Sequence, residues 1–502
     1  MIEKIEQKTY LHFDAFLKER EILRIVNDPE AVAKNAFYPF LGYTKKIDRF
    51  SPPKEKRQGK PRKTKERDIR YASRRDSAIF QAYRKLLLPN YEERLRTAGI
   101  DEVAIAYRKI PVPDRPQSGK CNIHHACDVF CAIQDVAPCL ALALDISGFF
   151  EHIDHSKLYA LWCNLLGVST LPKDHLKVFK GITNYSVVDL DKALEIVPRP
   201  SDHRQVQLCS PSVFREKIAP LANKNKNPFG IPQGSPISDL LANLALLNFD
   251  IEINTWVKSM GGTYKRYSDD IVLIIPTKGS TNSGNIIQSY SSFVNTALSK
   301  AGDMLKIKDE KTCCGVFDKR GDLVTYEPVK PPSVSDKDFK RKPFEYLGFS
   351  FDGQRVLLRN PTVSGFYRKL VGRTRLIIQE FIRRYPDKSV EQLRPYITAN
   401  TVIERFLKIE DFQEKAEEYE NWTFWSYARR CDEIMSKANK FESGIIRQLA
   451  GVRKKIRGII AQDLQEIYRN VKRSPSKRKK RLLKQFSTQT GSVGETKASE
   501  KA

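Results

Sequence analysis

The sequence predicts an α+β fold, because two short buried strands are separated by a helical stretch and followed by a mainly helical region. The strands are expected at residues 139–144 and 270–275, where five or six apolar residues follow one another, as in strands buried on at least one face. Residues 235–257 carry a long apolar helical pattern between them. Beyond residue 360 the pattern stays helical to about residue 470.

Composition favours a large protein that binds a polyanion. The chain has 502 residues, 40% of them hydrophobic, which is enough to build sizeable cores in several domains. Lys and Arg number 87 against 60 Asp and Glu, a formal charge of +27 that favours a nucleic-acid partner over an acidic substrate. Nine scattered Cys suit reduced thiols, and no apolar run is long enough to cross a membrane. We therefore expect a cytoplasmic protein with no membrane partner.

The segments before the first strand read in order as helix, basic loop and helix. Residues 1–50 mix apolar and charged positions at helical spacing, which predicts helix. Residues 51–67 hold eight Lys or Arg together with Pro and Gly, which predicts a basic loop or short hairpin. Residues 76–96 predict an amphipathic helix broken at Pro89, with Asp76 as its N-cap.

Two further helices are expected at residues 122–134 and 285–302. The chain ends in a basic stretch followed by Ser, Thr, Gly and Lys, which predicts a disordered tail.

Three aspartates at strand ends carry the strongest chemical signal. Asp145 ends the first apolar run, and Asp269 with Asp270 directly precedes the second. Neighbouring side chains alternate across a regular strand, so an Asp-Asp pair fits a tight hairpin better. Taken alone, such a pair is more often a solvated turn. In a basic protein it also suits two Mg²⁺ ions about 3.5–4 Å apart, which stabilise the attacking and leaving oxygens of a nucleotidyl transfer.

The order of the motifs makes this signal specific. Between the acidic strands, residues 230–238 (GIPQGSPIS) form a loop that opens a helix, where Gly permits close backbone approach and Gln can bind a base or sugar edge. After them, residues 344–350 (FEYLGFS) predict a hairpin around Gly348. Block by block, the chain resembles the palm of reverse transcriptases. The five matching blocks are residues 141–154, 230–250, 264–275, 303–315 and 344–353.

The resemblance extends to the fingers and to a subgroup. Residues 65–73, Asp76 and residues 91–93 are similar to the fingers motifs of bacterial reverse transcriptases, so the likeness covers residues 60–355 and, more weakly, the chain to about 470. Residues 106–109 and 209–215 resemble the bacterial defence-associated group, the unknown-group and abortive-infection enzymes. At position 268 the family usually has Ala or Met where this chain has Ser. That position does not ligate metal in the family.

The resemblance implies a right-hand polymerase with fingers, a palm of antiparallel sheet plus helices, a thumb and a helical C-terminal extension. The expected parts are an N-terminal helical segment (1–50), fingers (51–138), palm with a fingers insertion (139–355), helical thumb and C-terminal region (356–470) and a basic disordered tail (471–502).

By the same resemblance, Asp145 and Asp269 bind two Mg²⁺ ions, Asp270 completes the cluster, and the main-chain carbonyl of Ile146 is a further ligand. Phe150 stands where RNA-synthesising relatives usually carry an Asp that reads the ribose 2′-OH. Its ring would collide with that hydroxyl, which predicts deoxynucleotide incorporation. The alternative is that Phe149 and Phe150 are both core residues.

Further nucleotide contacts are expected from six residues. Gln233 and Gly234 should lie under the incoming nucleotide and template, and Lys65, Arg67 and Arg70 are candidates to grip its triphosphate. Lys311 resembles the fourth-motif lysine that neutralises pyrophosphate. For each of these basic residues, an ordinary solvated position remains the alternative.

The sequence therefore predicts an RNA-directed DNA polymerase that uses dNTPs in antiphage defence, with a noncoding RNA as template, primer or scaffold and a DNA product. The oligomeric state is left open, a homo-oligomer included. The alternatives are a retron-type enzyme that makes a branched RNA–DNA product, and a catalytically silent RNA-binding scaffold, against which the intact aspartates argue. Cys121, His124, His125, Cys127 and Cys131 suggest zinc by spacing, but the same segment has a continuous apolar helix face.

Overall fold

The computed structural model forms two compact units: Met1–Cys121 with Ala132–Phe344, and Asn122–Cys131 with Glu345–Ala502. It describes residues 2–48, 64–200, 202, 206–277, 283–308, 312–331, 335, 339, 341–407 and 423–473. None of the helices in these ranges is long and apolar enough to cross a membrane.

The centre of the first unit is a five-stranded antiparallel sheet, the palm sheet, in the order β11–β10–β5–β9–β8. Its strands are β5 (Cys139–Asp145), β8 (Thr263–Tyr267), β9 (Asp270–Pro276), β10 (Cys313–Arg320) and β11 (Leu323–Pro328). Both strands predicted from apolar runs are confirmed. They lie side by side in the middle of the sheet, and Ile271–Ile275 are all buried.

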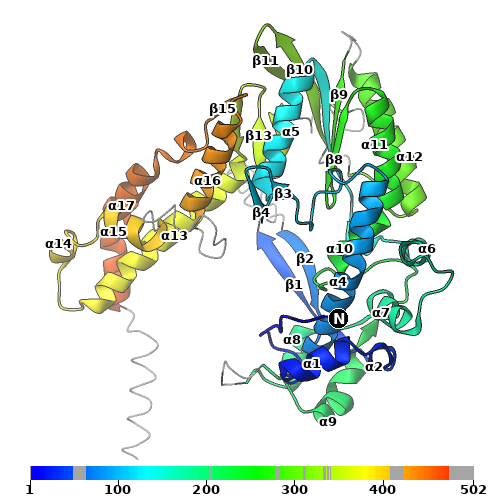
Figure 1. Cartoon of the computed structure of the whole chain (residues 1–502). Coiled ribbons are helices and arrows are strands. Elements are labelled where there is room, and N and C mark those ends of the chain that lie inside the picture. Colours follow the sequence, from blue (N-terminus) through cyan, green and yellow to red (C-terminus); the bar gives the residue numbers. More distant parts are fainter. Residues whose placement is uncertain are drawn as a thin grey trace, which may run out of the picture. The chain divides into compact units, whose positions relative to one another are not determined.

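Three helices cover the palm sheet: α10 (Ser238–Ala245), α11 (Leu247–Ser259) and α12 (Ser283–Ala301). α11 packs on β8, and α12 packs on β10 and α11 (Figure 1). The prediction of α12 is confirmed. The single helix predicted over residues 235–257 is instead two helices, because the backbone leaves the helical region at Leu246 (φ −104°, ψ 11°).

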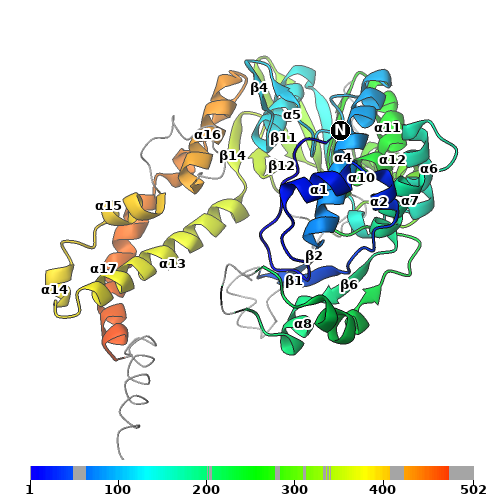
Figure 2. The same cartoon turned by 60° about the horizontal axis from the view of Figure 1, so that its bottom comes forward.

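The first unit has a second sheet, here named the fingers sheet, in the order β2–β1–β6–β7. Its strands are β1 (Phe40–Asp48), β2 (Thr64–Tyr71), β6 (Ser186–Asp189) and β7 (Asn223–Lys224). Figure 2 shows β6 and α8 (Leu190–Ile196) beside β1. The expectation of helix over residues 1–50 is right for α1 (Glu19–Val26) and α2 (Pro29–Ala33) but wrong for β1.

β1 is a strand because its backbone pairs on both edges, with β2 and with β6. These partners are distant in the sequence, so local helical spacing could not reveal them. β1 and β2 form an antiparallel hairpin, in which only residues 64–67 of the predicted basic segment take part. The rest of that segment lies outside the described residues, so the expectation of a loop or short hairpin there stays a prediction. Residues 49–63, which connect them, lie outside the described ranges.

Helix α4 (Arg74–Thr97) runs through Pro89 without a break, and its N-cap is Ser73, whose hydroxyl accepts a hydrogen bond from the Asp76 amide. Both predictions for this helix are therefore wrong. Proline has no amide hydrogen, so the helix loses one backbone hydrogen bond at Pro89. The burial of side chains on both sides of it, such as Leu87 and Tyr91, stabilises the helix by more than this loss costs. Asp76 is itself buried and accepts hydrogen bonds from Asn35 and the Tyr38 amide.

The remaining elements of the first unit are β3 (Pro111–Val112), β4 (Arg115–Gly119), η1 (Phe149–Glu151), α6 (His155–Leu166), α7 (Lys173–Thr183), α9 (Pro211–Val213), η2 (Phe214–Ile218) and η3 (Ala219–Leu221). One continuous apolar core joins α4, the palm sheet and α6, α7, α10 and α11. A smaller core behind the fingers sheet includes Phe13, Leu41 and Ile218.

The second unit is mainly helical, as predicted beyond residue 360. Its two long helices, α13 (Asn360–Arg384) and α17 (Val452–Arg473), lie side by side (Figures 1 and 2). α17 continues through the first three residues of the predicted tail, and residues 474–502 lie outside the described ranges. The other elements are β12 (Phe344–Tyr346), β13 (Phe349–Phe351), β14 (Arg355–Leu358), α14 (Val390–Leu393), α15 (Ala399–Val402), η5 (Ile403–Leu407), α16 (Phe424–Lys437), β15 (Glu442–Ser443) and η7 (Arg447–Leu449).

Two details of this unit bear on the predictions. The turn between β12 and β13 is Leu347-Gly348, both with positive φ, which agrees with the predicted hairpin around Gly348. The first ten residues of helix α5 (Asn122–Val136) belong here, where the Phe130 ring stacks on Phe351 with centroids 4.9 Å apart.

Candidate active site at the palm hairpin

The backbone positions of the three predicted aspartates lie at one end of the two central palm strands. In the β5–β9 register Asp145 lies directly opposite Asp270, so their side chains share one face of the sheet. Tyr267 pairs with Asp270 across the β8–β9 hairpin, which leaves Ser268 and Asp269 as its turn. The Ile146 amide donates a hydrogen bond to the Asp269 carbonyl (2.9 Å). Backbone pairing therefore brings together Asp145 and Asp270, which are 125 positions apart in the chain.

The turn is held in a conformation that a non-glycine residue adopts at a cost. Ser268 has φ 58°, in the left-handed region that costs an L-residue about 1–2 kcal/mol. Its carbonyl accepts a hydrogen bond from the Arg266 guanidinium (3.0 Å), and its hydroxyl accepts one from the Tyr107 hydroxyl (3.1 Å). These two bonds fix the residue that immediately precedes Asp269.

Arg266 belongs to a fully buried ion pair beneath this turn. Its Nε and Nη2 bind the two carboxylate oxygens of Asp250 at 2.8 and 2.5 Å, and neither side chain is exposed. The Tyr264 hydroxyl also donates to Asp250 (2.7 Å). Burial opposes the charge on Arg266, but the Asp250 carboxylate outweighs burial and raises the pKa of Arg266 above its ordinary value. Arg266 therefore stays charged and continues to donate its hydrogen bond to the Ser268 carbonyl.

A loop that precedes the palm strands in the sequence, residues 103–107, also supports the β8–β9 turn. Arg266 exchanges backbone hydrogen bonds with this loop, donating to Val103 (2.8 Å) and accepting from Ile105 (2.9 Å). The Asn243 side chain of α10 donates to the Ala106 carbonyl (2.9 Å) and accepts from Arg266 (3.2 Å). These contacts position the next residue of the loop, Tyr107, against the β8–β9 turn.

Tyr107 is fixed from the other side as well. The Arg84 guanidinium of α4 donates to the Tyr107 carbonyl (3.0 Å) and forms a bidentate ion pair with Asp239 of α10. Burial raises the pKa of the Tyr107 phenol, which remains a neutral donor to Ser268. Sequence reasoning assigned no role to Arg266, Asp250 or Tyr107. The sequence signals were that Arg266 directly precedes Tyr267-Ser268-Asp269-Asp270, and that Tyr107 and Asp250 lie within segments that carry the family resemblance.

The second motif lies against the fingers. Gly234 has φ +119°, and a Cβ on it would come 2.6 Å from the Arg70 carbonyl, so only glycine fits. The Arg70 amide donates to the Gln233 carbonyl (3.0 Å). The structure thus brings three predicted nucleotide contacts together: Arg70, Gln233 and Gly234.

Phe150 is tied to the same motif, because the Ile231 amide donates to its carbonyl (2.8 Å). Its side chain is half-buried against the main core, whereas Phe149 is buried with 3% of its surface exposed. The core interpretation therefore holds for Phe149. The steric role of Phe150 stays a prediction.

Arg70 lines a polar cavity of about 470 Å³ on the fingers sheet. Its guanidinium donates to the Tyr185 hydroxyl (3.0 Å) and lies over that ring, 5.5 Å from the centroid. Arg67 is exposed and three positions earlier on β2, so it points to the opposite face of the hairpin. The structure does not group Arg67 with Arg70.

The fourth motif, residues 303–315, is hydrogen-bonded to Asp145 through its backbone. The Lys308 amide donates to the Asp145 carbonyl (2.7 Å), and the Ser147 amide donates to Lys306 (2.9 Å). Lys311 lies outside the described residues. The backbone of Lys65 pairs with Ile47.

The donors gathered here are of the type that magnesium prefers. Carboxylate oxygens and a main-chain carbonyl are hard ligands, and the hydrogen bonds given above use the Asp145 carbonyl and the Ile146 amide but not the Ile146 carbonyl. As the side chains stand, no three His, Cys, Asp or Glu of the described residues form a ready-made metal-binding group, at this hairpin or in the Cys121–Cys131 segment.

Comparison with known proteins gives a family for the palm. Residues 107–351 match the family described as reverse transcriptase (RNA-dependent DNA polymerase). No curated protein matches the sequence.

Similar solved structures include polymerases from fungi and a virus. Telomerase from Candida albicans, in complex with a TWJ fragment of telomeric RNA, has 12% identity and a TM-score of 0.35, over 88% of this chain and 67% of that chain. The corresponding Candida tropicalis complex has 13% identity and a TM-score of 0.31, over 90% and 67%. An insertion-loop deletion mutant of the RNA-dependent RNA polymerase of a human picorbirnavirus has 12% identity and a TM-score of 0.34, over 78% and 64%.

The family match spans Asp145, the 230–238 loop and the β8–β9 hairpin, in the α+β polymerase fold predicted from the sequence. Reverse transcriptase domains generally use divalent metal ions. The chain therefore contains a reverse transcriptase domain over residues 107–351, and the protein is an RNA-directed DNA polymerase, a nucleotidyltransferase.

Proposed function

We propose that this polymerase copies RNA into DNA from dNTPs with two Mg²⁺ ions held by Asp145, Asp269 and Asp270, with the Ile146 carbonyl as a further ligand. The observation that carries the proposal is the pairing of Asp145 with Asp270, fixed by the Ile146–Asp269 hydrogen bond. When bound, such ions promote deprotonation of the primer 3′-hydroxyl and neutralise charge on the leaving pyrophosphate.

The protein's own residues hold the reacting groups in place. Arg266 and Tyr107 fix Ser268, and so fix the backbone that presents Asp269. A turn backbone that is already fixed leaves only the carboxylate side chains to rearrange when the ions bind. The geometry that supports this role is the buried network beneath the turn, which leaves the turn backbone little freedom.

The nucleotide is proposed to lie over Gln233 and Gly234. Arg70, hydrogen-bonded to Gln233 through its backbone, is the best-placed contact for the triphosphate. Lys65, Arg67 and Lys311 stay predicted contacts. Phe150, whose carbonyl binds the amide of Ile231, would exclude a ribose 2′-OH from the same space.

We also propose that the enzyme acts in bacterial antiphage defence with a noncoding RNA as template, primer or scaffold. The support is the resemblance of residues 106–109 and 209–215 to the defence-associated group, together with the charge of +27.

The main test is incorporation of labelled dNTPs or NTPs by purified protein with Mg²⁺ and its co-expressed flanking RNA. Asp269→Ala/Asp270→Ala should abolish incorporation. The matched control is Asp322→Ala, an exposed carboxylate at the β10–β11 turn of the same sheet, which should leave it intact. Incorporation unchanged in the double variant would refute the site.

Sugar selection gives a second test. The unchanged enzyme should prefer dNTPs, and Phe150→Val should raise the NTP to dNTP ratio by about tenfold or more, since removing a clash worth about 1.4 kcal/mol changes selection tenfold. A preference of the unchanged enzyme for NTPs would refute the role of Phe150.

Sequencing the nucleic acid that copurifies with the protein separates the biological alternatives. A branched RNA–DNA molecule would favour the retron-type enzyme over the defence role. RNA without any DNA product, together with no incorporation, would favour the catalytically silent scaffold.

A further inference from the structure

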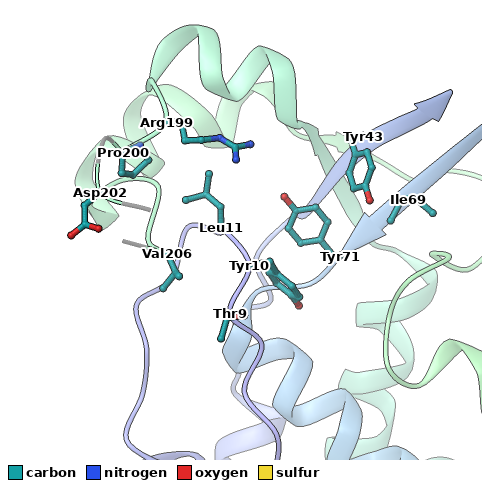
Figure 3. A pocket seen from close by; sticks show the side chains of 10 residues that line it. All are labelled: Thr9, Tyr10, Leu11, Tyr43, Ile69, Tyr71, Arg199, Pro200, Asp202 and Val206. Carbon is teal, nitrogen blue, oxygen red and sulfur yellow. The ribbon is translucent and has the colours of Figure 1, made fainter. Parts of the chain in front are cut away.

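An aromatic pocket of about 560 Å³ lies on the fingers, apart from the nucleotide contacts described above. It is lined by Tyr43 of β1, Ile69 and Tyr71 of β2, Tyr10 and Leu11 of the N-terminal segment, and Arg199 (Figure 3). Tyr43 is paired with Ile69 in the hairpin register, and Arg70 is paired with Gly42. Side chains alternate along a strand, so this pocket and Arg70 are on opposite faces of the β1–β2 hairpin.

Three tyrosine rings form one wall of the pocket. Tyr10 and Tyr71 contact edge to face with centroids 4.8 Å apart, and Tyr43 follows Tyr71 at 6.2 Å. Tyr43 keeps 40% of its surface exposed, so its ring is available to a planar partner. Burial raises the pKa of both Tyr10 and Tyr71 to about 12, so that these phenols stay neutral.

A cation faces this wall. In Figure 3 the Arg199 guanidinium points across the cavity toward Tyr71, while the Asp202 carboxylate points away from the tyrosines. The charge of Arg199 also acts on Tyr71, lowering the pKa that burial raises. The pocket therefore offers stacking surface on one side and one positive charge on the other.

We propose that this pocket binds one unpaired base of an RNA strand, stacked on Tyr43, with the adjoining phosphate on Arg199. Aromatic side chains that stack single bases, beside a basic group that binds the backbone, are how proteins hold single-stranded nucleic acid. The proposal rests on the proposed function in taking RNA as the partner.

The charge distribution favours a strand over a free nucleotide. A triphosphate needs several cationic or backbone donors. Among the described residues that line the pocket, Arg199 is the one cation, which matches a single backbone phosphate. The excess of 27 positive charges in the chain supplies the long-range attraction to a strand that a single arginine does not.

The test measures equilibrium binding of a fluorescein-labelled single-stranded RNA, about 20 nucleotides long, to full-length protein. All variants are made in the Asp269→Ala/Asp270→Ala background, so that synthesis cannot consume the RNA. Tyr43→Ala should weaken binding about tenfold, the loss of one base stack, and Tyr43→Phe should stay within about twofold. Arg199→Gln should weaken binding and reduce the slope of log K against log salt by about one.

The matched control is Tyr396→Ala, an exposed tyrosine of the second unit (55% exposed), which should leave RNA binding unchanged. Circular dichroism checks that Tyr43→Ala is folded, and ultraviolet crosslinking with mass spectrometry should place an RNA adduct on a pocket tyrosine. Binding unaffected by both Tyr43→Ala and Arg199→Gln would overturn the proposal. So would release of the RNA by free ATP or dATP at this pocket.

The outcome is separable from that of the proposed function. If the double aspartate variant still incorporates dNTPs, the catalytic assignment fails while the pocket variants can still weaken binding. If that variant is inactive but the pocket variants bind RNA normally, the pocket inference fails alone.

Discussion

Two β-hairpins of the first unit, β8–β9 in the palm sheet and β1–β2 in the fingers sheet, are built in opposite physical ways. The palm turn rests on a buried ion pair, and Ser268 and Arg266 are each less than 5% exposed. The fingers hairpin exposes residues 43–46 and 66–68 to solvent. Metal ligands gain from a backbone that cannot move, whereas a surface that holds a changing nucleic acid gains from exposed aromatic and basic groups. Five variants test this difference between the two hairpins.

The largest effect is expected from Asp250→Asn. It leaves the buried Arg266 charge without its counterion, and breaking such a pair typically costs about 3–5 kcal/mol. Urea unfolding should show this loss, and dNTP incorporation should fall with it.

A second variant separates stability from positioning. Arg266→Met/Asp250→Leu removes both charges and should unfold near the midpoint of the unchanged protein, because apolar replacements of buried pairs are often neutral. It lacks the bond to the Ser268 carbonyl, so kcat should fall more than KM for dNTP changes. Normal kcat in a stable double variant would show that the network supports only the fold.

Gly234→Ala tests the contact between fingers and palm. The new Cβ would lie 2.6 Å from the Arg70 carbonyl in a left-handed backbone, so we expect a loss of about 2–3 kcal/mol and a raised KM for dNTP. Gly321→Ala is the matched control, since Gly321 also has positive φ (+61°) but no atom within 4 Å of its Cβ position. It should cost only about 1 kcal/mol in the same unfolding measurement. Equal losses in the two variants would show that the close approach to Arg70 does not matter.

His12 makes the fingers side sensitive to acid. It is fully buried against Tyr71, and burial, followed by the charge of Arg74, lowers its pKa from 6.5 to about 3. Between pH 3 and pH 6.5 the unfolded chain has a protonated His12 while the native chain does not. The His12 contribution to the free energy of unfolding is therefore fully present above pH 6.5 and falls as the pH drops toward 3. From about pH 7.5 to pH 5.5 the contribution of His12 should fall by about 1 kcal/mol.

The measurement is the difference in unfolding free energy between the unchanged protein and His12→Asn at the two pH values. Asn removes the titration but keeps a side-chain oxygen that can accept the hydrogen bond from the Phe13 amide. Other titrating groups, such as Asp76, are common to both proteins and cancel. A difference that does not change with pH would contradict the assignment.

Ser268→Ala should have the smallest effect. It removes the hydrogen bond from Tyr107, worth about 1 kcal/mol, but keeps the Arg266 bond to the carbonyl. Incorporation should stay within a few-fold in a steady-state assay. A loss of a hundredfold or more would mean that the hydroxyl itself takes part in the reaction.

The sequence predicted what local patterns and motif order encode. The runs at β5 and β9, the helices α5 and α12 and the hairpin at Gly348 follow from periodicity and turn residues, and the order of the motifs identified the polymerase fold. The pairing of Asp145 with Asp270 follows from that order.

What the sequence could not give depends on distant contacts. β1 has helical spacing but becomes a strand between β2 and β6, and α4 passes Pro89 because its neighbours bury both flanks. Arg266 and Asp250 are two charged residues among many in the sequence. Only the fold shows that both are removed from water and aimed at each other.

Helix α5 is divided between the two units, and this division has a practical consequence. Its first ten residues complete the C-terminal unit, where Phe130 meets Phe351 and Cys127 meets the Ile434 carbonyl, although they are synthesised more than two hundred residues earlier. During translation the apolar surface of this helix stays exposed until the residues of the second unit that cover it have been synthesised. A truncated product ending at Phe344 should keep that surface bare and aggregate, so the polymerase core is best expressed together with its C-terminal half.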